Sequence, residues 1–387
     1  MHLLFLTKWY PNTSDITNGI FIESLALQIA KNHKVTVIAL HPQAELDEKK
    51  TVTDTQNFNY RLIQLYFRAK EPLNWIARWY NLAQWLLAFV RAWKILKNTN
   101  KKPDLVHVHV LTRPAVMAYG LKLFYGIPYV ITEHWSRYLR NEYKNKNLLY
   151  KKITSFVAAR AKAFTCVSER LMQELVQAGI HNQIMQVIPN MVDVTAKTDT
   201  VEGNRGGRNT IFIATVSDLV DKTKNISSVL YVLSNIKPIF SAFEYHLVGD
   251  GPDAEAFKQL VEQLKLTDKV FFHGRQDHDY ICSFLPVIDF LVTNSYSETF
   301  SIVTAEALSL GKPVIATRCG GPESYINEGN GILIDVDSPR QLEDALLFMI
   351  KNCKNYSPDK LRASVRQFSP EIIVKQYNNL YQMVLTS

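Results

Sequence analysis

The sequence has few cysteines and no long apolar run. Its 387 residues include only four cysteines, Cys166, Cys282, Cys319 and Cys353, without the spacing of a metal site. This pattern indicates reduced, structural thiols rather than a disulfide framework. No apolar stretch approaches the roughly 20 residues that a membrane-spanning helix needs. The apolar run within residues 1–8 is too short for a signal peptide and is typical of a first core strand. These absences predict a cytoplasmic protein.

Motifs that would define other classes are also missing. The turn Gly249-Asp250-Gly251-Pro252 is followed by Asp253 and Ala254, so it lacks the third glycine of the dinucleotide fingerprint. This argues against a nicotinamide-dependent enzyme. We identify no acidic metal signature and no nucleic-acid motif, and we find no internal repeat. We therefore expect neither a metal nor another cofactor, and no nucleic-acid partner.

Negative charge is scarce in the first half of the chain. Residues 1–200 carry a net charge of +12 and residues 201–387 carry −4, which gives the total of +8. A one-sided positive field implies an anionic partner for the first half, such as a membrane surface, nucleic acid or an acidic acceptor.

Short apolar strands alternate with helical stretches in two series, which predicts two α/β domains with parallel sheets. The first series has expected strands at 3–6, 34–40, 105–110, 129–132 and 163–167. The second has them at 210–216, 245–249, 270–274, 290–293, 314–317 and 331–334. We place the domains at residues 1–195 and 210–368, with a polar, Gly-rich linker at 196–209. The tail, residues 369–387, is expected to form an amphipathic helix.

The most informative segment follows the expected strand at 289–293. Residues 294–297 have turn chemistry, and a helical apolar face begins at about Thr299. The free N–H groups of the first turn, at Thr299, Phe300, Ser301 and Ile302, would form an anion site beyond the end of the strand. This arrangement predicts a pocket for a diphosphate.

Two glutamates flank this helix start. Glu298 precedes it and Glu306 lies two turns inside it. Ionised carboxylates accept hydrogen bonds from sugar or ribose hydroxyls, so the pair could grip different ends of one ligand. The alternative is an N-cap glutamate and a solvated helix glutamate.

The segment and its surroundings resemble the retaining nucleotide-sugar glycosyltransferases of family 4. The resemblance rests on six motifs in the order of the family. These are Trp9-Tyr10-Pro11 with Asn18-Gly19-Ile20-Phe21, Ile131-Thr132-Glu133-His134, Val187-Ile188-Pro189-Asn190, Val248-Gly249-Asp250-Gly251-Pro252, the two-glutamate segment, and Gly311-Lys312-Pro313-Val314 with Gly320-Gly321-Pro322-Glu323. It implies the GT-B fold, in which two facing Rossmann-like domains enclose a cleft and the last helix packs back on the first domain.

The resemblance assigns roles to residues along the cleft. It implies that Gly19 lets the backbone approach the ligand and that His134 lies beside the donor sugar. It places Gly249 and Gly251 next to the nucleotide, and Arg275 where the backbone meets the base. Glu298 would hold sugar hydroxyls and Glu306 the ribose. Glu133 alternates to the opposite face of its strand and is expected to be structural.

One position departs from the family pattern. The family places an arginine and a lysine six residues apart, and both meet the diphosphate; Lys224 matches the lysine, but Asp218 occupies the arginine position. An aspartate cannot neutralise a phosphate. Either Lys224 and the helix N–H groups suffice, or Lys222 substitutes, or donor binding is weak.

The resemblance implies glycosyl transfer with retention at the anomeric carbon and without a protein nucleophile. Lys224 and the helix start would stabilise the departing diphosphate of a UDP- or GDP-linked sugar. The acceptor would be a lipid-linked or polysaccharide glycan, as in the synthesis of lipopolysaccharide or capsule.

A tryptophan-rich stretch at 73–97 is the candidate for acceptor or membrane contact. Trp75, Trp79 and Trp93 recur at helical spacing, with Arg78 and Arg91 beside them. Tryptophans with cations suit the interface of an anionic leaflet. They would place the enzyme peripherally on the cytoplasmic face of the membrane. The alternative is a helix whose tryptophans belong to the core, and one helix can do both.

Two other functions remain open. An epimerase or hydrolase of nucleotide sugars with the same fold would need no acceptor. A non-catalytic membrane-binding protein would account for the basic first half, although it would not need both glutamates and His134.

Overall fold

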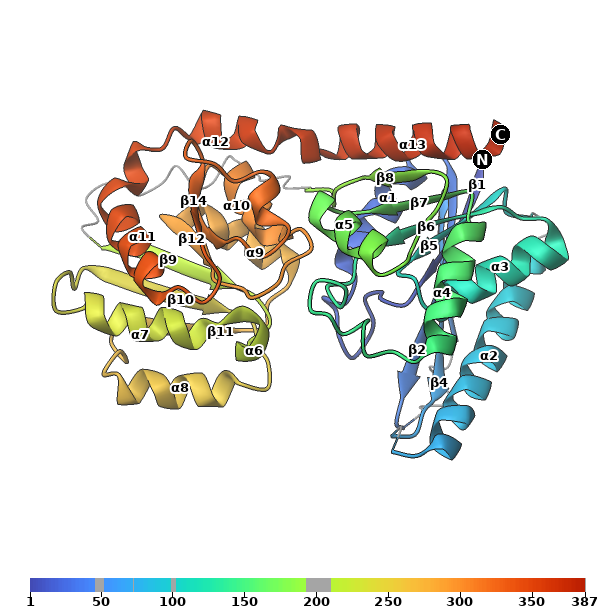
Figure 1. Cartoon of the computed structure of the whole chain (residues 1–387), viewed down its shortest axis with the longest axis horizontal. Coiled ribbons are helices and arrows are strands. Elements are labelled where there is room, and N and C mark those ends of the chain that lie inside the picture. The colour runs from blue at the N-terminus through green and yellow to red at the C-terminus, as the bar shows by residue number, and fades with distance from the viewer. Residues whose placement is uncertain (46–51, 72, 99–101, 193–209, 387) are drawn as a thin grey trace.

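The computed structural model describes residues 1–45, 52–71, 73–98, 102–192 and 210–386. Its strands form two sheets, one from each half of the chain, as expected for the GT-B fold. Figure 1 shows the two lobes side by side, with the C-terminal helices α12 and α13 along one edge of both. The predicted linker at 196–209 lies outside the described residues.

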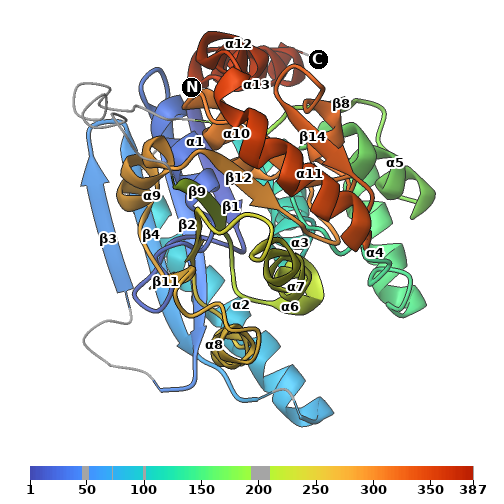
Figure 2. The ribbon, with the colours of Figure 1, turned by 90° about the vertical axis from the view of Figure 1, so that its left-hand side faces the viewer.

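The N-terminal sheet has the order β3-β4-β2-β1-β5-β6-β7-β8. All neighbouring pairs are parallel except β3 with β4. Figure 2 shows β3 at the outer edge. The strands are β1 (His2–Thr7), β2 (Lys34–Gln43), β3 (Val52–Asn57), β4 (Tyr60–Arg68), β5 (Leu105–His109), β6 (Tyr129–Glu133), β7 (Ala163–Cys166) and β8 (Met185–Val187). Its helices are α1 (Ile20–Ala30), α2 (Trp75–Lys97), α3 (Arg113–Tyr125), α4 (Leu148–Arg160) and α5 (Glu169–Gln177).

The C-terminal sheet is fully parallel, with the order β11-β10-β9-β12-β13-β14. Its strands are β9 (Ile211–Val216), β10 (Phe243–Val248), β11 (Val270–Gly274), β12 (Phe290–Thr293), β13 (Val314–Thr317) and β14 (Gly331–Ile334). Its helices are α6 (Asp221–Lys224), α7 (Ile226–Ile236), α8 (Ala254–Gln263), α9 (His278–Phe284), α10 (Ile302–Ser309), α11 (Pro339–Asn352) and α12 (Pro358–Ser364).

The long helix α13 (Pro370–Thr386) returns to the N-terminal sheet. Its buried residues Tyr377 and Tyr381 pack in one hydrophobic cluster with Leu3, Phe5 and Ile22 of β1 and α1. The Tyr381 hydroxyl lies 2.7 Å from His107 Nδ1 on β5. The last helix therefore completes the core of the first domain.

The carboxyl ends of parallel strands are where open α/β sheets bind ligands, at the point where the strand order reverses. That point lies between β1 and β5 in the N-terminal sheet and between β9 and β12 in the C-terminal sheet. The loops after β1 and β12 carry two of the six motifs found in the sequence, and the other four lie at β6, β8, β10 and β13.

Candidate active site

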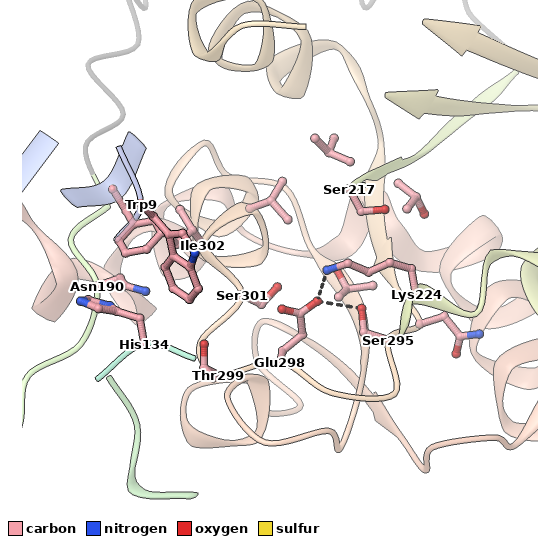
Figure 3. Close-up of a pocket in the computed structure, with 16 residues that line it drawn as sticks. Trp9, His134, Asn190, Ser217, Lys224, Ser295, Glu298, Thr299, Ser301 and Ile302 are labelled. Atoms are coloured by element: carbon pink, nitrogen blue, oxygen red, sulfur yellow. Dashed lines mark hydrogen bonds and ion pairs between the residues drawn. The ribbon is translucent and has the colours of Figure 1, made fainter. Parts of the chain in front are cut away.

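A cavity of about 240 Å³ lies between the two domains, at the carboxyl ends of β9 and β12. The N-terminal half contributes its lining from loops after β1, β6 and β8 and from α1. The lining residues are Trp9, Phe21, His134, Asn190, Thr215, Val216, Ser217, Lys224, Thr293, Asn294, Ser295, Glu298, Thr299, Ser301, Ile302 and Val303. Figure 3 shows His134, Trp9 and Asn190 on one side of this space and Lys224 with Glu298 on the other.

Backbone contacts hold Glu298 in place. Its N–H donates to the carbonyl of Cys319 at 3.1 Å, and its carbonyl accepts from the N–H of Gly321 at 2.8 Å. A Cβ on Gly321 would lie 2.4 Å from Cα of Phe300, so only glycine permits this close approach. The Gly-Gly pair after β13 thus supports the loop that carries the glutamate.

Glu298 is joined to Lys224 inside the cavity. Lys224 Nζ donates to Glu298 Oε1 at 2.6 Å, and Ser295 Oγ donates to the same oxygen at 2.8 Å (Figure 3). Burial opposes the charge of Lys224, but the attraction and hydrogen bond of Glu298 more than offset it, so the pKa of Lys224 is raised. The lysine therefore carries its positive charge at neutral pH.

The helix start lies a few residues later than predicted. Helix α10 begins at Ile302, with Ser301 as its N-cap in the left-handed region at φ 67°. Thr299, Ser301 and Ile302 line the cavity, as the sequence indicated. Phe300 does not: its side chain is buried, and its carbonyl accepts from the Tyr325 hydroxyl at 2.9 Å.

Glu306 has a partner outside the cavity lining. Its carboxylate Oε1 lies 2.9 Å from Nε2 of His278 on α9, and only 6% of the residue is exposed. Contacts of His278 with Cys282 and then Glu306 raise the pKa of that histidine to about 10. Glu306 is thus held by a positive charge in the ligand-free protein, which the sequence did not indicate.

His134 directly follows β6 and is neutral. Burial lowers its pKa to about 3, against the opposing effect of Asn190. Its Nε2 lies 3.1 Å from Nδ1 of His109, a second buried histidine at the end of β5. One ring nitrogen of this pair must donate to the other, so His109 influences which tautomer His134 presents. Glu133 is buried as expected and accepts from the N–H groups of His134 and Trp135 at 2.9 Å each.

The three predicted glycines support the site through backbone contacts. Gly19, the left-handed N-cap of α1, passes so close to Trp9 that a Cβ would lie 2.6 Å from its carbonyl. Gly249 and Gly251 pass the loop after β9, where a Cβ would lie 1.8 Å from the Ser217 oxygen and 2.4 Å from the Leu219 oxygen. The three glycines therefore pack against the loops that border the cavity, and none of them lines it.

Arg275 links the two domains. Its Nη1 lies 3.0 Å from Thr17 Oγ1 and 3.4 Å from Asp15 Oδ1 in the N-terminal half, and 4.0 Å from Asp218 Oδ1. The family pattern has an arginine at the position of Asp218. In this protein Asp218 instead lies opposite a cation, Arg275. Both side chains are largely exposed, and neither lines the cavity.

The tryptophan-rich helix serves both the core and the surface. Trp75 and Trp79 are 70% and 64% exposed, and Arg78 and Arg91 are exposed beside them. Trp93 is only 8% exposed and its ring packs against Tyr125, so the prediction that it contacts a membrane or acceptor is wrong. Trp75 and Trp93 lie on the same helical face, about five turns apart. Trp93 belongs to the C-terminal half of α2, which packs into the hydrophobic core with Trp85 and Phe89, whereas Trp75 stands in the first turn.

Two Asp-x-Asp pairs occur in the chain, at 277–279 and 335–337, and both have local structural contacts. Asp277 caps α9 by accepting from the Tyr280 N–H at 2.8 Å. Asp335 accepts from Gln341 Nε2 at 2.9 Å. Among the described residues, no three His, Cys, Asp or Glu side chains gather as a metal ion would require.

Several lining residues were not predicted as site residues from the sequence. Trp9, Phe21 and Asn190 belong to motifs that were noted without an assigned role, and Ser217 and Ser295 were not singled out. Their common signal is position: most of them closely follow the carboxyl end of a parallel strand.

Family models match both halves of the chain. Residues 19–196 match the model described as Glycosyltransferase Family 4, and residues 200–368 match Glycosyl transferases group 1.

Curated relatives and solved structures agree with these matches. The N-acetyl-alpha-D-glucosaminyl L-malate synthase of Bacillus anthracis is 29% identical over 73% of this chain and 75% of its own. A putative teichuronic acid biosynthesis glycosyltransferase of Bacillus subtilis is 24% identical over 89% and 88%. The HepE protein of Anabaena, solved with UDP, superposes with a TM-score of 0.74 at 20% identity over 99% and 100%. The chain is thus a member of the group 1, family 4 glycosyltransferases and has the GT-B fold.

Proposed function

We propose that this enzyme transfers a sugar from a UDP- or GDP-linked donor to a lipid-linked or polysaccharide acceptor, with retention at the anomeric carbon and without a metal ion. One observation carries the proposal: a charged lysine and a carboxylate, Lys224 and Glu298, share a cavity with a neutral histidine, His134. A cation for the leaving diphosphate and hydrogen-bonding groups for the sugar thus stand within one space. Uracil is the first choice of base for the donor nucleotide, because HepE was solved with UDP.

On the donor side, Lys224 and the first turn of α10 stabilise the leaving group. In the transfer, the bond from the anomeric carbon to the diphosphate oxygen breaks, and the bond to the acceptor oxygen forms on the same face. The acceptor proton passes to the departing diphosphate. Negative charge develops on that diphosphate in the transition state, and a preoriented cation lowers its energy. Lys224 supplies the cation without a metal ion.

Glu298 and His134 act on the sugar. The carboxylate of Glu298 has one oxygen bound to Lys224 and Ser295, which leaves lone pairs for sugar hydroxyls. The neutral imidazole of His134 can donate to or accept from a hydroxyl, depending on its tautomer. The two groups reach the sugar from opposite domains, so closure of the cleft on the donor would complete the site.

A direct test replaces Glu298 with alanine and measures both donor hydrolysis and transfer. We expect transfer to fall by about 10- to 100-fold, since a hydrogen bond to a charged group contributes about 1.5–3 kcal/mol. Glu262→Ala, which removes an exposed glutamate of α8, is the control and should leave both rates unchanged. Full transfer by the Glu298 variant would overturn the assignment, and hydrolysis without any acceptor dependence would favour a hydrolase.

We propose that the acceptor is a glycan or glycolipid of the cell surface. The Bacillus subtilis relative is named for teichuronic acid biosynthesis, which supports a surface-polysaccharide role. Exposed apolar side chains just before and on α2 and at the start of α4 add a route to the membrane: Leu73, Trp75, Ile76, Trp79, Leu87, Leu148 and Leu149. Exposed cations on the same helices include Arg78, Arg91 and Lys152. None of the described helices has the length and apolar character needed to cross a bilayer.

This surface supports the proposal of peripheral attachment to the cytoplasmic leaflet, because each cation near an anionic membrane contributes about 1 kcal/mol. The protein should pellet with phosphatidylglycerol vesicles at low salt, and the double variant Trp75→Ser, Trp79→Ser should pellet much less. Tyr231→Ser removes an exposed aromatic residue of α7 and is the matched control. Failure of the wild type to pellet under these conditions would exclude the attachment.

A further inference from the structure

The N-terminal sheet repeats the arrangement that forms the donor cavity. In the C-terminal sheet, the cavity lies beyond β9 and β12, where the strand order reverses. The N-terminal order reverses between β1 and β5, and β6 is the next strand. By the same rule, a second ligand site is expected beyond the carboxyl ends of β1 and β5.

Each of these strands is followed by a cation. Lys8 comes directly after β1, Arg113 opens helix α3 after β5, and Arg137 lies four residues beyond the end of β6. Arg137 is buried, and its guanidinium donates to the carbonyl of Leu111 at 2.8 Å and to the Tyr150 hydroxyl at 2.7 Å. Lys8 and Arg113 are partly packed against neighbouring groups but keep exposed surface. Two accessible cations and a buried one therefore follow the ends of three neighbouring strands.

Trp135 contacts two of these cations, Lys8 and Arg137. Lys8 Nζ lies 3.8 Å from the centroid of the Trp135 ring, and the guanidinium carbon of Arg137 lies 4.3 Å from it. Such contacts orient the cations but do not neutralise them. The Trp135 ring also packs edge to face on Trp9, with 5.5 Å between centroids. Since Trp9 lines the donor cavity beside His134 (Figure 3), the cations adjoin the place where the sugar would react.

Positive charge in this cluster exceeds negative charge. Burial, then Arg137, Arg113 and Lys146, lower the pKa of Lys8 to about 8, while Glu133 opposes them. The Glu133 carboxylate, whose charge opposes the lowering of the Lys8 pKa, is buried and accepts hydrogen bonds from three backbone N–H groups. Within the described part of the chain, neither Lys8 nor Arg113 has a carboxylate within 4.0 Å. Like charges gathered without counter-ions favour an anionic ligand.

We propose that Lys8 and Arg113, backed by Trp135, form an acceptor subsite for a phosphate group. The inference rests on the proposed function, because it treats the adjoining cavity as the donor site. A phosphate bound here would hold an acceptor hydroxyl near the anomeric carbon, so the enzyme would select acceptors with a phosphate close to the hydroxyl that is glycosylated. That phosphate belongs either to a membrane lipid headgroup or to a free phosphorylated acceptor.

The test measures binding of inorganic phosphate and sn-glycerol 3-phosphate by calorimetry, with UDP present in excess to fill the donor site. The variants are Lys8→Gln, Arg113→Gln and the double variant. Lys8→Arg keeps the charge, and Lys375→Gln removes an exposed lysine of α13 as the control. We expect each glutamine variant to bind phosphate about tenfold more weakly, since charge-assisted hydrogen bonds are lost. Lys8→Arg and Lys375→Gln should bind as the wild type does.

A second arm identifies the source of the phosphate. The same variants are tested for pelleting with vesicles that contain phosphatidic acid. Weaker vesicle binding together with weaker phosphate binding would indicate a lipid headgroup, and weaker phosphate binding alone a free phosphorylated acceptor.

The outcomes separate the subsite from the proposed function. UDP affinity, measured first, should be equal in all variants. Equal phosphate binding by wild type and double variant would overturn the subsite, as would a loss of UDP affinity in the double variant, which would assign the cations to the donor. If the wild type binds no UDP, the proposed function fails, and the same titration on the free protein still decides the phosphate site.

Discussion

Lys224 and Glu298 show how single residues can prepare a site before any ligand arrives. Lys224 has one hydrogen-bonded anionic partner at 2.6 Å, and its ammonium group keeps further donors for a diphosphate. The same contact fixes the Glu298 carboxylate, which we propose holds the sugar. A double role of this kind explains why both residues stand within the cavity lining.

Gly249 gives a prediction at this scale. Gly249 has a φ of 140°, and a Cβ at this position would clash with the Ser217 carbonyl oxygen at 1.8 Å. Gly249→Ala should therefore lower the free energy of unfolding by about 1–3 kcal/mol. Urea unfolding measures this. The control is Gly120→Ala in the interior of α3, where a Cβ meets nothing within 4 Å. That change should be neutral or stabilising by up to about 1 kcal/mol. Equal effects of the two substitutions would contradict the close packing of the Gly249 turn.

The sequence predicted individual site residues where a motif matches the family pattern. Glu298, His134 and Lys224, which that resemblance singled out, line the cavity. It did not indicate that Glu306 pairs with His278 on another helix, since a pairing between distant segments leaves no local pattern. It also could not show that Arg275 faces Asp218, because those loops meet only in the folded protein.

Among the elements, helix α13 joins the end of the chain to its first strands. The Tyr381 hydroxyl bonds His107 in a fully buried place, so Tyr381→Phe leaves a ring nitrogen unpaired and should destabilise the protein by about 1–3 kcal/mol. Thermal and urea unfolding would report the change. Tyr231→Phe, on an exposed tyrosine of α7, should have an effect near zero. If both variants were equally stable, the contact of α13 with β5 would contribute nothing.

Elements with apolar runs were predictable, and polar ones were not. Nearly every buried strand of both sheets matches its predicted range within two or three residues. The hairpin of β3 and β4 was missed: β3 is polar and almost wholly exposed, and the first apolar residues of β4 are interrupted by polar ones. The three-residue strand β8 was missed as well. The short helix α6, which positions Lys224, was missed too, since four polar residues show no periodicity.

For the whole molecule, buried neutral histidines predict acid sensitivity. Burial lowers the pKa to about 3 for His107 and His134 and to about 4 for His41 and His246. In the unfolded chain they take up protons near pH 6.5, so stability is full above that pH and falls as the pH drops towards the folded pKa values. Each contributes up to about 1.4 kcal/mol per pH unit. Urea unfolding at about pH 7.5 and about pH 5.5 should show a marked loss, and equal stability would contradict neutral burial.

The two domains meet at a cavity whose central feature is one lysine, so the most direct measurement is UDP affinity by calorimetry for the wild type, Lys224→Met and the control Lys375→Met. The account predicts that the wild type and the control bind UDP equally. Lys224→Met should bind about 10- to 100-fold more weakly, because a charge-assisted contact to the diphosphate is lost. Equal affinity in all three proteins, or no binding by the wild type, would contradict the assignment of this cavity as the donor site.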